Sequence, residues 1–369
     1  YRELESLVLE SNVESLQQSV VSGDMSYEEL TLFYLARIRE SENDPARYLN
    51  AVISLNPAAV NRARELDAER LANPDSERDP VFGMPVLLKD NINVAGMPTT
   101  AGAVALQNNL AGNAFITERL LEKGAIILGK ANLSEWAYFF CDDCPSGWSA
   151  MGGQTLNPYG RLQFGTGGSS SGSAIALACS LVSFALGTDT AGSGRIPAAF
   201  NRLTGFKLSK GLLSTSGVVP ACRSLDCVTV FTHNTADAAL VASVAATFDA
   251  TDPFGRPNSP DNALGAHSQW QGRLSLAVIN PDQLAFFGDA DYADAYQETI
   301  RRIEQDNVQL TPIDFEPFVT AANQLYDGPW VTERYIAISE LLERSPDVIL
   351  PVTRAIIGAG KERYATEVY

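Results

Sequence analysis

Two glycine- and serine-rich stretches at the centre of the chain constrain its fold more than any other feature. The first runs from Gly165 to Ser173 and the second from Gly187 to Arg195, with the apolar segment Ala174–Leu186 between them. Flexible linkers can have this composition, but linkers do not normally flank a segment with the character of a buried helix and strand. The pattern therefore predicts two ordered loops attached to a packed core.

From Pro80 onward, short apolar runs alternate with segments of helical pattern. We expect strands at Pro85–Lys89, Ala125–Gly129, Leu181–Leu186, Val228–Thr232, Leu274–Ile279 and Leu310–Phe315. We expect helices at Thr117–Lys123, Ser171–Ser180, Thr235–Phe248 and Asp289–Glu304. This alternation predicts an α/β fold around a mixed, largely parallel central sheet covered by helices.

The first 75 residues predict a packing layer of helices that carries no chemistry. Ser26 and Glu29 form a capping-box pattern, and Asn56-Pro57 predicts the start of a charged helix that runs to about Leu71. The apolar residues that follow the capping box on one face are Leu30, Phe33, Tyr34 and Ile38. We expect one domain over residues 1–369, with this helical layer at 1–75 and the catalytic core at 76–369. The proline-rich segment Asp252–Gln271 is expected to be a long loop within it.

Charge and hydropathy exclude several classes of partner. The chain has 44 acidic and 27 basic residues, a formal net charge of −17, which argues against a nucleic-acid or anionic-membrane partner. The longest mostly apolar run, Ala174 to Gly187, is too short to span a bilayer, and the N-terminus lacks the pattern of a signal peptide. Five cysteines do not suggest a disulfide framework, so a cytoplasmic location is expected. A homodimer is one assembly that the sequence leaves open.

Histidine is scarce, which constrains the chemistry. The 369 residues include only two histidines, His233 and His267. Hydrolases with a Ser-His-Asp triad, histidine-rich zinc sites and histidine acid–base pairs therefore become improbable. If the chain is a hydrolase, another group must deprotonate its nucleophile.

The second glycine-rich stretch could supply a nucleophile and an oxyanion hole. Small residues let backbone N–H groups approach a substrate, and the N–H groups of Thr190, Ala191, Gly192 and Ser193 could bind an oxyanion while the Ser193 hydroxyl attacks. A phosphate-binding loop is the alternative. Neither stretch has the Gly-Lys-Ser/Thr ending of a P-loop or a clean dinucleotide fingerprint, so nucleotide binding is disfavoured.

Lys89 is the candidate base. It ends the apolar run Pro85–Lys89, and burial there would disfavour its ammonium form, leaving the amine partly neutral near pH 7. On its own the motif would favour another interpretation, a lysine paired with Asp90 at a strand end.

Together these elements resemble the amidase signature family of serine hydrolases. The matching segments include Gly83–Ile92, Gly129–Trp136, Gly152–Pro158, both glycine-rich stretches, Ile196–Phe200 and Gly205–Lys207. The resemblance implies the amidase signature fold, with Lys89 as catalytic lysine, Ser169 as a bridging serine held by a cis peptide bond, and Ser193, 24 residues later, as nucleophile. It also implies a proton relay from Ser193 through Ser169 to Lys89, an acyl-enzyme, and no cofactor or metal. Asp189 and Arg195 would hold the shape of the nucleophile loop.

The second half of the chain resembles allophanate hydrolases more specifically, through Gly211–Cys227 and Tyr326–Tyr335. That resemblance implies a small ureide substrate, release of ammonia, a pathway link to urea carboxylase, and a substrate carboxylate held by Tyr326 and Arg334. A spacing of eight residues is near two helical turns, so both could face one pocket. Spacing alone would favour a core tyrosine and a surface arginine paired with Glu333 or Glu340.

Other observations keep two alternatives open. Ser134 to Ser149 resembles broad-specificity amidases of neutral amides, and the family also includes amidotransferase subunits of tRNA-dependent complexes. The chain stops at Tyr369, where family members continue, so we expect it to lack C-terminal elements of the domain.

Two smaller motifs carry little weight. Cys141 and Cys144 have a zinc-like spacing but no second close pair, and are interpreted as loop or partly buried thiols. His233 is expected to pack or cap before a helix that starts with Thr235 as its cap.

Overall fold

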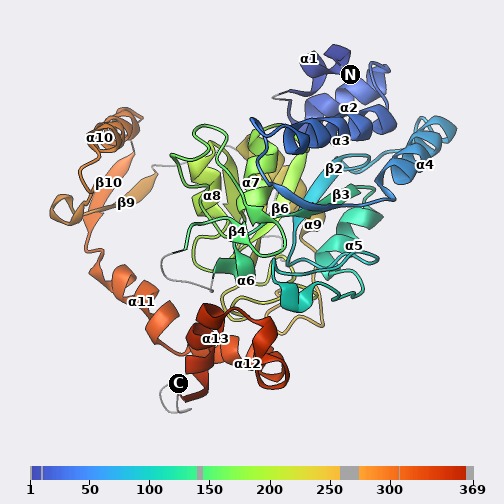
Figure 1. Ribbon diagram of the computed structural model, residues 1–369. Helices are drawn as coiled ribbons and strands as arrows, with labels where there is room; N and C mark the ends of the chain where they lie inside the picture. Colours follow the sequence, from blue (N-terminus) through green and yellow to red (C-terminus); the bar gives the residue numbers. More distant parts are fainter. Residues whose placement is uncertain (1, 10, 139–143, 258–273, 307, 363–369) are drawn as a thin grey trace. The chain divides into compact units, whose positions relative to one another are not determined.

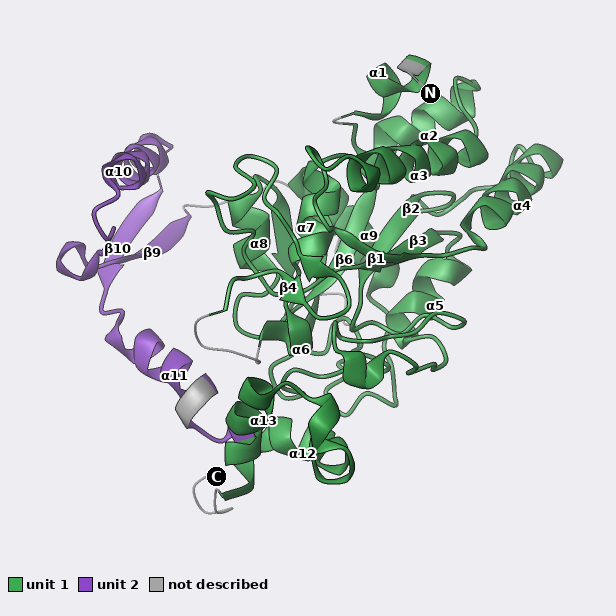
Figure 2. Ribbon diagram, in the orientation of Figure 1, with its two compact units in different colours: residues 1–265, 332–363 green, residues 266–331, 364–369 purple. Residues whose placement is uncertain are grey.

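The computed structural model describes the chain except residues 1, 10, 139–143, 258–273, 307 and 363–369, and the side chains of Arg2, Tyr326 and Asp327. Most of the predicted loop Asp252–Gln271, Cys141 and His267 therefore lie outside the described residues. The described chain divides into two compact units (Figures 1 and 2). Unit 1 comprises residues 1–265 and 332–363, and unit 2 comprises the segment 266–331.

The N-terminal part of unit 1 is helical, as the sequence predicts. Its helices are η1 (Arg2–Leu4), α1 (Glu5–Val8), α2 (Val13–Ser22), α3 (Tyr27–Asn43) and α4 (Ala59–Ala72). The capping box before α3 is formed, because Ser26 accepts the N–H of Glu29 and the Glu29 side chain accepts the N–H of Ser26. The apolar face predicted for α3 is buried in the core. The helix expected to begin at Asn56-Pro57 begins later, at Ala59, because Asn56 Oδ1 accepts the N–H of Ala58 and holds a turn there.

A six-stranded sheet forms the centre of unit 1. Its strands, in spatial order, are β1 (Val52–Leu55), β3 (Ile126–Ala131), β2 (Pro85–Lys89), β6 (Phe184–Asp189), β8 (Cys227–Thr232) and β7 (Thr204–Lys207). The pairs β3–β2 and β2–β6 are parallel, whereas β1–β3, β6–β8 and β8–β7 are antiparallel. The α/β fold with a mixed sheet is confirmed, but its parallel part is smaller than expected and covers only the three strands β3, β2 and β6.

Helices that pack against the sheet are α5 (Phe115–Glu122), α7 (Ser171–Ala178), α8 (Arg195–Phe200) and α9 (Thr235–Ala245). This part of the chain also forms η2 (Val104–Leu106), α6 (Glu135–Tyr138) and a short hairpin of β4 (Trp148–Ser149) and β5 (Gly153–Gln154). Helix α7 is buried from Ser171 to Leu177 and contacts β2, β3, β6 and β8. Its first turn is the end of the Gly165–Ser173 stretch, so the packing of the helix fixes that loop in place.

The C-terminal part of the described chain adds helices and a second small sheet. Unit 2 contains β9 (Ser275–Ile279) and β10 (Gln309–Ile313), which pair in parallel, together with η4 (Pro281–Gln283), α10 (Ala290–Gln305) and α11 (Glu316–Asp327). The remaining helices are α12 (Trp330–Arg344), η5 (Pro346–Val348), α13 (Pro351–Gly358) and η6 (Ala359–Glu362). Across the residues that the structure describes, no helix is both long enough and apolar enough to cross a bilayer.

Candidate active site

The central strands bring the predicted relay residues to neighbouring positions. Lys89 is the last residue of β2, which lies between β3 and β6. Ser169 precedes α7, and Ser193 lies in the loop after β6. Parallel strands end at the same edge of a sheet, so the end of β2 and the loop that follows β6 meet there. Three segments that are far apart in sequence thus supply the three residues.

Lys89 is fully buried, and its amine donates hydrogen bonds to two hydroxyl groups. Its Nζ donates to Ser169 Oγ at 2.7 Å and to Thr188 Oγ1 at 2.9 Å. The same Thr188 oxygen accepts a hydrogen bond from Asn91 Nδ2 at 3.1 Å. The peptide bond between Gly168 and Ser169 is cis, as the resemblance implies. This geometry joins the predicted base directly to the predicted bridging serine.

The alternative pairing of Lys89 with Asp90 does not occur in the structure. Asp90 Oδ1 instead forms a buried ion pair with Lys130 Nζ at 3.0 Å. Lys130 lies on β3, the strand next to β2, and also donates to Thr99 Oγ1 at 2.9 Å. Two buried lysines on adjacent strands therefore have different partners, a carboxylate for Lys130 and hydroxyl groups for Lys89.

This environment prepares Lys89 to act as a base. Burial lowers the pKa of its ammonium to about 7, against the opposing effect of the negative charges on Asp226 and Asp189. A group with this pKa is substantially neutral near neutral pH and can accept a proton from a hydroxyl to which it is hydrogen-bonded. The arrangement can therefore withdraw a proton from Ser169 without a histidine.

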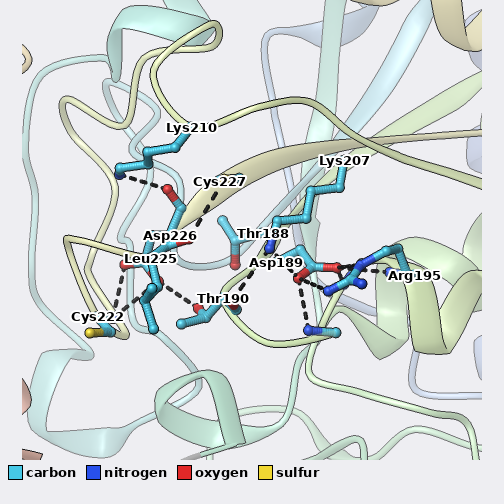
Figure 3. Close-up of polar contacts among 12 residues, drawn as sticks. Thr188, Asp189, Thr190, Arg195, Lys207, Lys210, Cys222, Leu225, Asp226 and Cys227 are labelled. Carbon is cyan, nitrogen blue, oxygen red and sulfur yellow. Dashed lines mark hydrogen bonds and ion pairs between the residues drawn. The ribbon is translucent and has the colours of Figure 1, made fainter. Parts of the chain in front are cut away.

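Asp189, the last residue of β6, organises the loop that carries Ser193 (Figure 3). Its carboxylate accepts hydrogen bonds from the N–H groups of Gly192 and Gly194, at 2.8 and 3.1 Å. It also forms ion pairs with Arg195 Nε at 2.9 Å and Lys207 Nζ at 3.0 Å. Burial opposes ionisation, but the bonds from Arg195 and Lys207 outweigh it and hold the pKa of Asp189 well below its usual value. The interpretation of Asp189 and Arg195 as residues that hold the loop is confirmed.

Ser193 is half-buried, and its carbonyl oxygen accepts the N–H of Ser170 at 3.1 Å. That bond ties the nucleophile loop to the first glycine-rich stretch. The N–H of Gly192, predicted as an oxyanion donor, already donates to Asp189. This assignment to Gly192 therefore disagrees with the structure, and the N–H groups of Thr190, Ala191 and Ser193 remain as the proposed donors.

We expect Asp189→Asn to lower the free energy of unfolding by about 3 kcal/mol, because an uncharged amide replaces a fully buried carboxylate that binds two cations and several N–H donors. The pKa of Asp189 is depressed in the folded state, so the wild-type advantage should be complete above the ordinary value of 3.8 and decline below it. Urea denaturation at several pH values measures this difference. Asp347→Asn, at a side chain that is 99% exposed, is the control and should change stability by less than about 0.5 kcal/mol.

Arg334 lies buried in α12, with 5% of its surface exposed. The two acidic residues proposed as partners of a surface arginine have contacts elsewhere, since Glu333 binds Ser224 and Cys222, and Glu340 pairs with Arg344. Burial raises the pKa of Asp226, and among the groups that lower it is the charge of Arg334, which places Arg334 near the carboxylate that binds Thr190. The interpretation of Arg334 as a surface residue is therefore wrong.

The structure says less about Tyr326 than about Arg334. Tyr326 lies in the last turn of α11, which has Gly328 as its C-cap, whereas Arg334 belongs to α12. The single helical stretch expected for the two residues is thus interrupted. The side chain of Tyr326 lies outside the described parts of the chain, so its role stays a prediction.

Sequence reasoning missed several residues of this site. Thr188, Asn91, Lys207, Asp226 and Glu333 all form hydrogen bonds within the network that surrounds the relay. Thr188 and Lys207 lay within the motifs that carry the resemblance, which was a usable signal. Asp226 and Glu333 also lay within segments that carry the resemblance, but their contacts with Thr190 and Ser224 join positions far apart in sequence and could not be read from a local pattern.

The structure also describes Cys144 and His233, which belong to the two smaller motifs of the sequence. Cys144 is disulfide-bonded, contrary to its interpretation as a thiol. Within the described ranges, no group of three or more His, Cys, Asp or Glu side chains could hold a metal ion. His233 is partly buried before α9, but the N-cap of that helix is Asn234, whose side chain accepts the N–H of Asp237 at 2.8 Å, and not Thr235.

Comparison with known proteins agrees with this geometry. The family model described as Amidase matches residues 29–364. The urea amidolyase of Lachancea kluyveri is 35% identical over 323 residues, which cover 86% of this chain and 16% of that protein. The structure of Kluyveromyces lactis allophanate hydrolase superposes with a TM-score of 0.82 at 30% identity, covering 98% of this chain and 56% of that one. Peptide amidase from Stenotrophomonas maltophilia superposes with a TM-score of 0.78 at 31% identity, covering 96% and 76%.

Proposed function

The chain belongs to the amidase family and is an amidase signature amidohydrolase, and we propose that its substrate is allophanate, or urea-1-carboxylate, from which it releases ammonia. The mechanism rests on one observation above all, the 2.7 Å hydrogen bond between fully buried Lys89 and Ser169. The chain spans only 16% of the length of the urea amidolyases that it matches, so the activity of those whole proteins is carried over here as a proposal.

In the proposed reaction, neutral Lys89 accepts the proton of Ser169 while Ser169 accepts the proton of Ser193. The Ser193 oxygen then forms a bond to the amide carbonyl carbon, and the N–H groups of Thr190, Ala191 and Ser193 stabilise the resulting oxyanion. The relay returns a proton to the nitrogen as the C–N bond breaks, and ammonia leaves. Water, deprotonated by the same relay, cleaves the acyl-enzyme and regenerates Ser193. None of these steps requires a cofactor.

Recognition of an anionic substrate is assigned to Arg334, with Tyr326 as its proposed partner. A guanidinium group binds a carboxylate through two parallel hydrogen bonds, and it remains charged at any physiological pH. A protein with a net charge of −17 repels a small anion unless a local cation attracts it. The buried position of Arg334 near Asp226 supports this assignment, as do the names of the relatives, urea amidolyase and allophanate hydrolase.

We expect allophanate to be hydrolysed with a kcat/KM at least about tenfold above that of biuret, its neutral isostere, because only the carboxylate can pair with Arg334. Malonamate and malonamide form a second pair with the same difference in charge. Ammonia release measured over a range of concentrations gives both constants. Equal or faster turnover of the neutral member in both pairs would contradict the proposal.

A broad-specificity amidase of neutral amides is the second candidate, and one observation favours it. A cavity of about 480 Å³ in unit 1 is lined by Trp136, Val219, Ile338 and Leu341, among other residues. These apolar walls suit a larger hydrophobic amide better than allophanate. Including benzamide and a peptide amide in the same substrate comparison tests this candidate directly.

The proposed substrate also implies what must precede the reaction. Allophanate is urea with a carboxylate on one nitrogen, so an enzyme that carboxylates urea must supply it, and a urea carboxylase is the proposed pathway partner. The urea amidolyase relatives support this link. Ammonia release from urea, bicarbonate and ATP only when both enzymes are present would test it.

A further inference from the structure

Helix α12 is fastened to the 221–226 loop by the carboxylate of Glu333. Glu333 accepts hydrogen bonds from the N–H and the hydroxyl of Ser224, both at 2.7 Å, and from Cys222 Sγ at 3.2 Å. The chain separation between Ser224 and Glu333 is 109 residues, so this contact joins distant segments of unit 1. Three donors on one carboxylate fix both the position and the orientation of the first turns of α12.

The same 221–226 loop is folded around a second carboxylate, Asp226 (Figure 3). Asp226 accepts the N–H groups of Ala221 at 2.9 Å and Cys222 at 3.0 Å, and the hydroxyl of Thr190. Its own carbonyl oxygen accepts a hydrogen bond from Lys210 Nζ at 2.7 Å. Because Thr190 is the first residue after β6, Asp226 connects the loop to the nucleophile loop.

Arg334 follows Glu333 directly in the chain and is buried, with 5% of its surface exposed. Charged groups of both signs meet at this junction. Lys207 and Arg195 pair with Asp189, Lys210 donates to the carbonyl oxygen of Asp226, and the charge of Arg334 lowers the pKa of the Asp226 carboxyl against the effect of burial.

We propose that Glu333 and Asp226 are positioning residues for Arg334. Glu333 holds α12 against the 221–226 loop, and Asp226 holds that loop against the nucleophile loop, so that Arg334 meets a substrate carboxylate at a fixed distance from Ser193. This inference rests on the proposed function, because it takes Arg334 to be the group that binds the substrate carboxylate.

Glu333 and Asp226 have different contacts and therefore different proposed roles. Glu333 accepts hydrogen bonds from three donors of the loop, so its contacts hold the start of α12 in place. Asp226 lies near Arg334 and stabilises its charge in the absence of substrate, which limits the cost of a buried guanidinium. An error in the position of α12 would therefore weaken binding of anionic substrates specifically, while the relay at Lys89 would be unaffected.

The test is Glu333→Gln, which preserves the size of the side chain. It presents an amide to the hydrogen-bond donors that contact a carboxylate in the wild-type protein. We expect KM for malonamate to rise about tenfold, the effect of losing roughly one hydrogen bond to a charged group, with kcat within about twofold. The constants for neutral malonamide should stay within about twofold. The rate at which a neutral fluorophosphonate labels Ser193 should also be unchanged, which shows that the nucleophile is intact. Ser224→Ala removes one of the same hydrogen bonds and should give a smaller change in the same direction.

Glu343→Gln is the matched control, because it makes the same chemical change on the same helix at a side chain that is 56% exposed. It should leave all four constants unchanged. If Glu333→Gln and Ser224→Ala retain the wild-type ratio of malonamate to malonamide turnover, the positioning role is wrong. If the wild-type enzyme itself shows no preference for malonamate, the proposed function fails first. If Glu333→Gln does not fold, Ser224→Ala alone decides between these outcomes.

Discussion

Replacement of Ser193 by alanine is expected to lower kcat by about 10⁴-fold or more on every amide that the enzyme hydrolyses. The Ser193 oxygen is the atom that forms the proposed acyl bond, and its loop is fixed in place by Asp189. Remaining donors in the loop could still stabilise an oxyanion, so a small rate above that of water would persist. Ammonia release under single-turnover conditions measures the loss, and mass spectrometry after fluorophosphonate treatment shows whether any adduct forms.

Ser173→Ala is the control for this substitution. Ser173 is a buried serine of the first glycine-rich stretch, and its hydroxyl donates to the carbonyl of Leu186 at 3.0 Å. Its removal should cost about 1 kcal/mol of stability and leave kcat within a few-fold. Substantial turnover in Ser193→Ala, or an inactivation by Ser173→Ala as severe as that by Ser193→Ala, would contradict Ser193 as the specific nucleophile.

Lys89 should be equally indispensable, and two substitutions separate its charge from its basicity. Lys89→Met removes the amine, and Lys89→Arg keeps a positive charge that cannot be titrated in the physiological range. If Lys89 acts as a base, both variants should lose about 10³-fold or more in kcat, an effect at the upper end of general base catalysis combined with loss of the nucleophile's activation. Retention of high activity in Lys89→Arg would show that charge, and not proton acceptance, is what the site needs.

The pH profile of the wild-type enzyme tests the same role. Burial lowers the pKa of Lys89 to about 7, and only the neutral amine can accept a proton. The value of kcat/KM for a neutral amide should therefore rise about tenfold per pH unit below pH 7 and reach a plateau above it. A neutral substrate is required, because an anionic one would add its own titration and that of its binding site. A profile that is flat between pH 5.5 and 7 would rule out a lysine base with this pKa.

The sequence was sufficient to predict the central part of the fold and the contact between Lys89 and Ser169. Strand β2 has the bounds that its apolar run predicted. Its last residue, Lys89, donates a hydrogen bond to Ser169, and each of these two residues could be located from a short motif of its own. What a local pattern does not specify is the partner of a charged group. Asp90 is adjacent to Lys89 in the chain, yet its side chain pairs with Lys130 on the neighbouring strand, since consecutive residues of an extended segment point in opposite directions.

The strands of the central sheet that the sequence did not predict are short and lie at its edges. Strands β1 and β7 have four residues each, too few to show a period, and they occupy the two edge positions. The parallel content was overestimated because an alternation of apolar runs and helical segments does not specify the direction in which two strands pair. In the structure, β8 inserts between β6 and β7 and pairs with both in antiparallel fashion. Such pairings depend on segments far apart in the chain, as do the contacts of Asp226 and Glu333.

The contacts of Asp189 have a thermodynamic consequence for the catalytic cycle. Glycine-rich segments lose more conformational entropy on ordering than any other kind of sequence. Here one carboxylate binds the N–H groups of Gly192 and Gly194 in the free enzyme, so this entropy is lost once, when the chain folds. Each substrate molecule then meets a loop that is already ordered, and its binding energy remains available for the transition state.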